Sequence, residues 1–103
     1  ADRMKRAIAL ERPLLMGADA WRYPDALHYA ERDLELDFAL LRATREQMAA
    51  DLDRLAPDVW TRTAVHSETG LVTVRQLLFH AIRHLEWHVA TILEKRAAMG
   101  LDG

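Results

Sequence analysis

The chain has 103 residues, a length typical of one small domain, and half of them are hydrophobic, which is enough for a core. Its 14 basic and 16 acidic residues are interspersed and give a net charge of −2, so the charge pattern disfavours nucleic acid and anionic membranes as partners. No apolar run reaches the length of a membrane span and no signal peptide is visible, so we expect a cytoplasmic protein.

The sequence contains no cysteine. This excludes disulfides, thiolate ligands and a cysteine nucleophile. A metal site in this chain must therefore use His, Asp and Glu, a ligand set that favours zinc, nickel, iron or manganese.

The first half of the chain predicts two helices joined by a connection. Residues 1–11 have a helical pattern that opens without an N-cap, as the second half of a longer helix would, and Pro13 ends it. Residues 14–25 form a connection whose aromatic side chains, Trp21 and Tyr23, are expected to pack over the open end of a core. Residues 25–55 are helical again, with Asp25 or Asp33 as the N-cap. The apolar stripe of this helix consists of Leu34, Phe38, Leu41, Met48, Leu52 and Leu55.

The second half of the chain predicts one long helix after a connection over residues 57–72. In the connection, Trp60 is expected to seal the end of the bundle, and His66 is by default a loop histidine. Thr73 and Gln76 match a capping box, and Gly100 marks the end of the helix. No strand pattern, internal repeat or second domain is visible. We therefore expect a single all-α domain over residues 1–103, an up-and-down helical bundle.

The long helix over residues 74–99 carries His80, His84 and His88, each four residues from the next. At about 100° per residue, one sector of its surface is apolar and is expected to be buried. His88 falls inside this sector, His84 lies at its edge and His80 lies further out. The sector is formed by Val74, Leu77, Leu78, Ala81, Leu85 and Ile92.

Histidines at i and i+4 lie one turn apart on the same helix face and can reach one metal ion. His84 and His88 are the best pair, because His80 is roughly 12 Å from His88 along the axis. The alternative is that these are bundle histidines held by hydrogen bonds, since an H-x-x-x-H pair alone is weak evidence. A buried neutral His needs a partner, and a bound zinc-like ion needs a third protein ligand.

Several segments together resemble the DinB-like (DinB/YfiT) superfamily, which comprises metal-binding four-helix-bundle proteins that include hydrolases and thiol-dependent transferases. The resemblance covers most of the chain and is carried by E-R-P-L-L (residues 11–15) followed by Trp21, F-A-L-L-R (38–42), L-x-x-L-A-P-D-V-W-T-R (52–62), H-S-E-T-G-L-V-T-V-R-Q-L-L (66–78) and H-L-E-W-H (84–88).

The resemblance implies a divalent metal held by three His, two of which match His84 and His88. The third comes from the family's second helix, upstream of the stretch that matches Ala1. The family's first helix and part of its second therefore have no counterpart here, so we expect an N-terminally truncated bundle. Three sources of a third ligand remain open: residues upstream of Ala1, another chain, or a substitute among His28, His66, Glu31 and Glu35.

Two functions follow as expectations. The resemblance implies a metal-dependent transferase, of the thiol S-transferase type, or a hydrolase, acting on a small-molecule substrate. No general base can be named, because Glu86 points away from His84 and His88 on the helical wheel. The alternative is a non-catalytic helical domain that serves dimerisation or small-ligand binding. Long amphipathic helices without partners expose a broad apolar stripe, so we also expect a symmetric homodimer.

Overall fold

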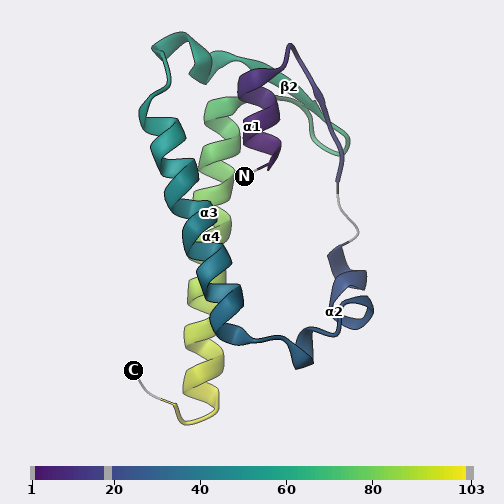
Figure 1. Ribbon diagram of the computed structural model, residues 1–103, viewed down its shortest axis with the longest axis vertical. Coiled ribbons are helices and arrows are strands. Elements are labelled where there is room, and N and C mark those ends of the chain that lie inside the picture. Colours follow the sequence, from purple (N-terminus) through teal and green to yellow (C-terminus); the bar gives the residue numbers. More distant parts are fainter. Residues whose placement is uncertain (1, 18–19, 102–103) are drawn as a thin grey trace.

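The computed structural model describes residues 2–17 and 20–101. Two long helices dominate it: α3 (Leu34–Asp53) and α4 (Val74–Ala98). The shorter helix α1 (Asp2–Ala9) lies beside one end of both (Figure 1). The prediction of a mostly helical chain is confirmed within these residues.

A small sheet lies at the same end of the molecule as α1. Strands β2 (Thr63–His66) and β3 (Gly70–Thr73) form an antiparallel hairpin, and β1 (Leu14–Leu15) pairs with β2 in parallel. The strand order is β1-β2-β3. The prediction of an all-α chain without strands is therefore wrong in this segment. Thr63, Val65 and Val72 are β-branched residues, which favour extended backbone.

The segment between β1 and α3 contains only short helical pieces: η1 (Ala20–Arg22), α2 (Tyr23–Ala26) and η2 (Tyr29–Glu31). Its aromatic side chains do not cover a core. Trp21 is 73% exposed and stacks with the guanidinium of Arg22, and Tyr23 is also exposed. The prediction that both pack over the end of the core is wrong within this chain.

The core is small and lies where α1, the sheet and the first turns of α4 meet. Its fully buried members come from four different elements and are Ala7, Leu15, Ala64 and Val74. Trp60, in the short helix η3 (Pro57–Thr61), packs against this cluster from the side, which agrees with its predicted place at one end of the helices. Met4 and Met48 are buried as well.

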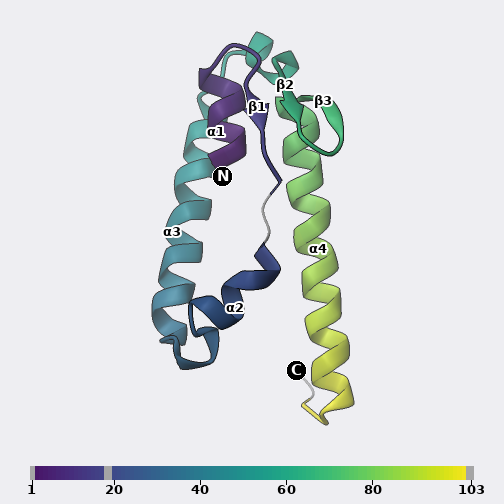
Figure 2. The same ribbon diagram turned by 90° about the vertical axis from the view of Figure 1, so that its right-hand side faces the viewer.

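Away from this core, α3 and α4 diverge. Figure 2 shows α1, β1 and the hairpin grouped at one end, and the two long helices standing apart from each other toward the other end. The radius of gyration is 16.4 Å, against about 13 Å for a compact domain of this length. The apolar stripe of α3 accordingly is buried only toward its C-terminal end: Met48 is buried, whereas Leu34, Phe38 and Leu41 are exposed.

The ends of the two long helices follow the sequence closely. The carboxylate of Asp33 accepts a hydrogen bond from the backbone N–H of Glu35, which makes Asp33 and not Asp25 the N-cap of α3. Thr73 and Gln76 form the predicted capping box, with bonds of 3.0 and 2.9 Å. Gly100 follows the last turn of α4 with φ of 76°, the left-handed conformation that glycine adopts most easily.

The capping box gives a stability prediction. Thr73→Ala removes the acceptor for the backbone N–H of Gln76, so we expect the free energy of unfolding to fall by about 1 kcal/mol, within a usual range of about 0.5–2 kcal/mol. Thr91→Ala is the matched control, because the hydroxyl of Thr91 donates only to the carbonyl of Trp87 within α4. Urea denaturation followed by circular dichroism measures both. Equal stability of the two variants would contradict the role of the cap.

Candidate metal-binding site

Helix α4 positions the histidines of this chain that were expected to bind metal. It runs 25 residues from its capping box without an interior Gly or Pro, so the spacing of four residues places successive rings one turn apart. The rings of His84 and His88 are 4.3 Å apart between centroids and are inclined at 76°. The rings of His80 and His84 are 6.0 Å apart and nearly parallel, at 10°.

These distances favour the pair His84 and His88 over the pair His80 and His84. With metal–nitrogen bonds of about 2.1 Å and angles of about 90–110° at the ion, two imidazole centroids lie roughly 4.5–5.2 Å apart. The separation of 4.3 Å between His84 and His88 is close to this range, so small side-chain rotations bring both rings onto one ion. The separation of 6.0 Å and the parallel stacking of His80 and His84 fit it less well.

All three histidines are exposed in this chain, and so are Leu85 and Ile92 on the same sector of α4. The prediction that His88, Leu85 and Ile92 are buried is therefore wrong for the single chain. Burial in α4 ends early: Val74 is buried and Leu77, Leu78 and Ala81 are half-buried. The reason is that α1 and the sheet reach only the first turns of the helix, whereas the apolar sector continues beyond them (Figure 2).

The described residues do not supply a third ligand. Within residues 2–17 and 20–101, no three or more His, Cys, Asp or Glu side chains form a group that could hold a metal ion. This includes His28, His66, Glu31 and Glu35, the substitutes considered from the sequence. His28 precedes η2 in the exposed connection, with φ of 52°.

His66 has a different task. Its Nδ1 accepts hydrogen bonds from the backbone N–H groups of Glu68 and Thr69, at 3.1 and 3.3 Å. An Nδ1 that accepts has no proton, so the neutral ring carries its proton on Nε2 and presents a donor there. His66 therefore holds the turn between β2 and β3 and has no free lone pair for a metal ion in this arrangement.

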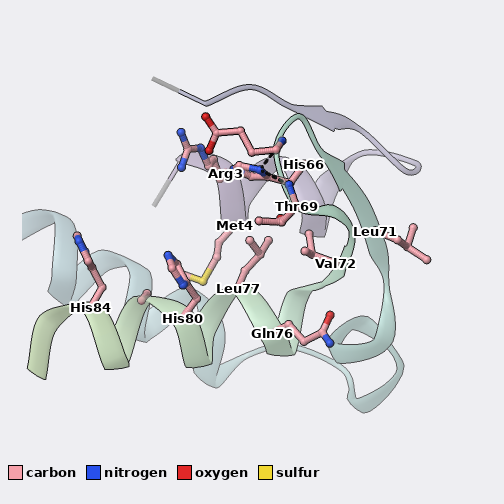
Figure 3. A pocket seen from close by; sticks show the side chains of 12 residues that line it. Arg3, Met4, His66, Thr69, Leu71, Val72, Gln76, Leu77, His80 and His84 are labelled. Atoms are coloured by element: carbon pink, nitrogen blue, oxygen red, sulfur yellow. Dashed lines mark hydrogen bonds between the residues drawn. The ribbon is translucent and has the colours of Figure 1, made fainter. Parts of the chain in front are cut away.

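One cavity of about 680 Å³ adjoins the histidine row (Figure 3). His80 and His84 enter it from α4, Arg3 and Met4 from α1, and His66 and Thr69 from the hairpin and its turn. The floor includes the apolar side chains of Val72, Leu77 and Ala81. Such a mixture of an apolar lining with a few polar groups is typical of a small-molecule site.

Two of the polar residues in this cavity are anchored by the fold. Arg3 donates from Nη2 to the carbonyl of Met16, at 2.9 Å, and His66 is held by the hairpin turn. Sequence reasoning considered His66 only as a substitute metal ligand beside His84 and His88, and it did not connect Arg3 with His84. Placing Arg3 and His66 in one cavity requires knowing that residues 63–73 form a hairpin. The signal of its turn in the sequence is Gly70 after Ser67, Glu68 and Thr69, and Gly70 has a φ of 80° in the structure.

A comparison with known families bears on the helical fold. The family model of the DinB superfamily matches residues 2–92, nearly the whole chain. The chain therefore belongs to the DinB superfamily, as its motifs suggested. No curated protein and no solved structure gave a significant match.

The described helices also bear on the expectation that the chain has no membrane span. None of the helices within residues 2–17 and 20–101 is long and apolar enough to cross a membrane.

Proposed function

We propose that this chain is a divalent-metal-binding protein of the DinB type, in which His84 and His88 supply two of the ligands. The observation that carries the proposal is the pairing of their rings at 4.3 Å on one face of α4, in a chain whose family membership is shown. Zinc, nickel, iron and manganese all accept imidazole nitrogen, and the chain offers no thiolate to select among them.

The activity that we propose is a metal-dependent transfer, of the thiol S-transferase type, or a hydrolysis. A divalent ion at His84 and His88 would act as a Lewis acid and lower the pKa of a bound water or thiol. The cavity beside His84 supports this assignment, because it gives a small substrate an apolar surface next to the metal ligands. Arg3 and the Nε2–H of His66 are the donors that would orient a polar group of that substrate.

A second function has its own supporting observation. The described residues contain no complete group of three ligands, and the cavity lies mainly on the side of His80 and His66. A non-catalytic domain that binds a small ligand there would need no metal. Metal analysis separates the two functions, because only the first requires a bound ion.

The metal is tested on protein purified without an affinity tag. We expect wild-type chain to bind Zn²⁺ or Ni²⁺ stoichiometrically and to melt at a higher temperature with metal than with chelator, since a ligand at 100 times its dissociation constant adds about 2.7 kcal/mol. The double variant His84→Ala, His88→Ala should lose both effects, with at least a hundredfold weaker binding. Elemental analysis and thermal denaturation provide the measurements.

His80→Ala is the matched control for this experiment. His80 is exposed and carried by the same helix, but its ring is stacked at 6.0 Å from that of His84. We expect the metal affinity of His80→Ala to stay within about threefold of that of the wild type. Loss of a residue that takes part in a metal site usually costs about 10–100-fold in affinity. Equal metal content in the double variant and the wild type would refute the assignment of His84 and His88.

A further inference from the structure

Two side chains of opposite charge lie at one edge of the cavity beside the histidine row. Arg3, in the first turn of α1, donates to the carbonyl of Met16 at 2.9 Å. Glu68, in the turn between β2 and β3, lies against Gly17, because a Cβ added at Gly17 would be 2.7 Å from Oε1 of Glu68. Both charged side chains line the cavity. Since Met16 and Gly17 are neighbours in the chain, the cation and the anion lie at the same edge.

Arg3 and Glu68 do not pair with each other. Within residues 2–17 and 20–101, neither side chain forms an ion pair. The bond of Arg3 to the carbonyl of Met16 uses one of the five N–H groups of the guanidinium, so the others are available to a ligand. A cation and an anion that stay unpaired at one edge of a cavity can each bind a ligand group of the opposite charge.

A third polar group of this cavity is the Nε2–H of His66. The Nδ1 of His66 accepts from the backbone N–H groups of Glu68 and Thr69, so the turn holds the ring in one orientation with its proton on Nε2. A ligand carboxylate has two oxygens, and two donors of the cavity, the guanidinium of Arg3 and the Nε2–H of His66, can bind them.

The floor of the cavity is apolar. Met4 is buried, and Val72, Leu77 and Ala81 are half-buried. Figure 3 shows Met4 and Leu77 pointing into the space between the hairpin and α4. An apolar chain that extends from the charged edge toward α4 therefore lies on these side chains. The volume of about 680 Å³ is within the range of small-molecule sites.

We propose that this cavity binds a small molecule with a free amino-acid head group and an apolar side chain. The carboxylate of the ligand binds Arg3 and His66, its ammonium group binds Glu68, and its side chain lies on Met4 and Leu77. Glu68 repels a ligand that has only a carboxylate, and Arg3 repels one that has only an amine, so the two residues select for both charges together. As the class of substrate, the proposal rests on the proposed function, but the binding step itself uses no metal ion.

The test compares norleucine with three compounds that each lack one part of it. Hexanoate lacks the ammonium group, pentylamine lacks the carboxylate, and alanine lacks most of the side chain. Binding to the full chain is measured by NMR titration of the backbone amide signals, with chelator present so that no metal ion contributes. We expect norleucine to bind at least tenfold more tightly than each of the others. A hydrogen bond to a charged group contributes about tenfold or more in affinity, and a buried methylene up to about fourfold.

Two substitutions assign the two charges of the ligand to their partners. Arg3→Gln should weaken norleucine and hexanoate at least tenfold and leave pentylamine unchanged or tighter, because the cation that repels the amine is gone. Glu68→Gln should weaken norleucine and pentylamine at least tenfold and leave hexanoate unchanged or tighter, for the opposite reason. Arg6→Gln is the matched control, since Arg6 lies on the same helix, pairs with Asp2 and is not part of the cavity lining. We expect Arg6→Gln to bind all four compounds as the wild type does.

The outcomes are distinguishable from a failure of the proposed function. Norleucine that binds no more tightly than hexanoate and pentylamine would overturn the amino-acid site, and so would an equal loss of all four compounds in either cavity variant. Binding of norleucine only when metal is present would overturn it as well. Each of these results leaves metal binding by His84 and His88 intact. A chain that binds norleucine as expected but never binds metal would overturn the proposed metal function and leave the amino-acid site standing.

Discussion

Leu15→Ala is expected to lower the free energy of unfolding by about 2–5 kcal/mol, the usual cost of truncating a fully buried leucine. Leu15 is 1% exposed and contacts a core whose other fully buried members are two alanines and one valine. Leu15 and Val74 are therefore the two largest fully buried side chains of that cluster. Because small domains are stable by about 5–15 kcal/mol in total, this loss would remove a large share of the stability.

Leu14→Ala is the control for this experiment. Leu14 is the neighbouring residue in β1, of the same type, and is 57% exposed. We expect its effect to stay within about 0.5 kcal/mol, as for other surface substitutions. Urea denaturation of both variants in parallel, followed by circular dichroism at 222 nm, measures the difference. Similar midpoints would show that the strand does not pack as described.

Ala7→Glu is expected to detach α1 and to destabilise the chain by more than about 3 kcal/mol, since a charge buried without a partner is among the costliest changes. Ala7 is 0% exposed, lies in α1, which contacts α4, and is a member of the core cluster. The described contacts offer no cation inside that cluster.

Ala9→Glu provides the comparison for Ala7→Glu, because Ala9 is exposed and two residues further along α1. Both variants carry the same added charge, so a difference in thermal midpoint reports burial alone. We expect Ala9→Glu to melt within a few degrees of wild type and Ala7→Glu to lose its cooperative transition. A cooperative, wild-type-like melt of Ala7→Glu would refute the packing of α1 against α4.

The helix boundaries could be predicted because they depend on local chemistry. Thr73 with Gln76, Asp33 and Gly100 each act through backbone groups within a few residues, and the structure confirms all of them. The choice between Asp25 and Asp33 was left open, since aspartate is a good N-cap at either position. The start of the apolar pattern at Leu34 is what distinguishes them.

The sheet was missed because its stability is not local. Strands β2 and β3 have four residues each and β1 has two, too few for an alternating pattern to stand out. Two of the six residue pairs of the sheet involve β1, which contacts β2 only after the segment between the two strands has folded back. The role of His66 could not be predicted for the same reason, since its Nδ1 accepts from a hairpin turn.

The histidine site shows what a helical pattern can and cannot specify. The spacing of His84 and His88 predicts that their rings lie side by side, and the structure places them 4.3 Å apart. Their metal binding stays a prediction. The apolar sector beside them also predicted burial, and here the prediction is wrong for the single chain, because periodicity identifies a face without identifying what covers it.

The parallel pairing of β1 with β2 has a consequence for how the chain reaches this structure. Its bonds, such as that from the backbone N–H of Ser67 to the carbonyl of Leu15 at 2.7 Å, join residues about 50 positions apart. Closing a loop of that size costs roughly 3.5 kcal/mol of chain entropy plus a constant. Helices α3 and α4 can form before this loop closes. The pairing of β1 with β2 is therefore expected to set the folding rate. The same logarithm makes the exposed stretch 20–32 tolerant of insertions, since doubling the loop adds only about 0.6 kcal/mol.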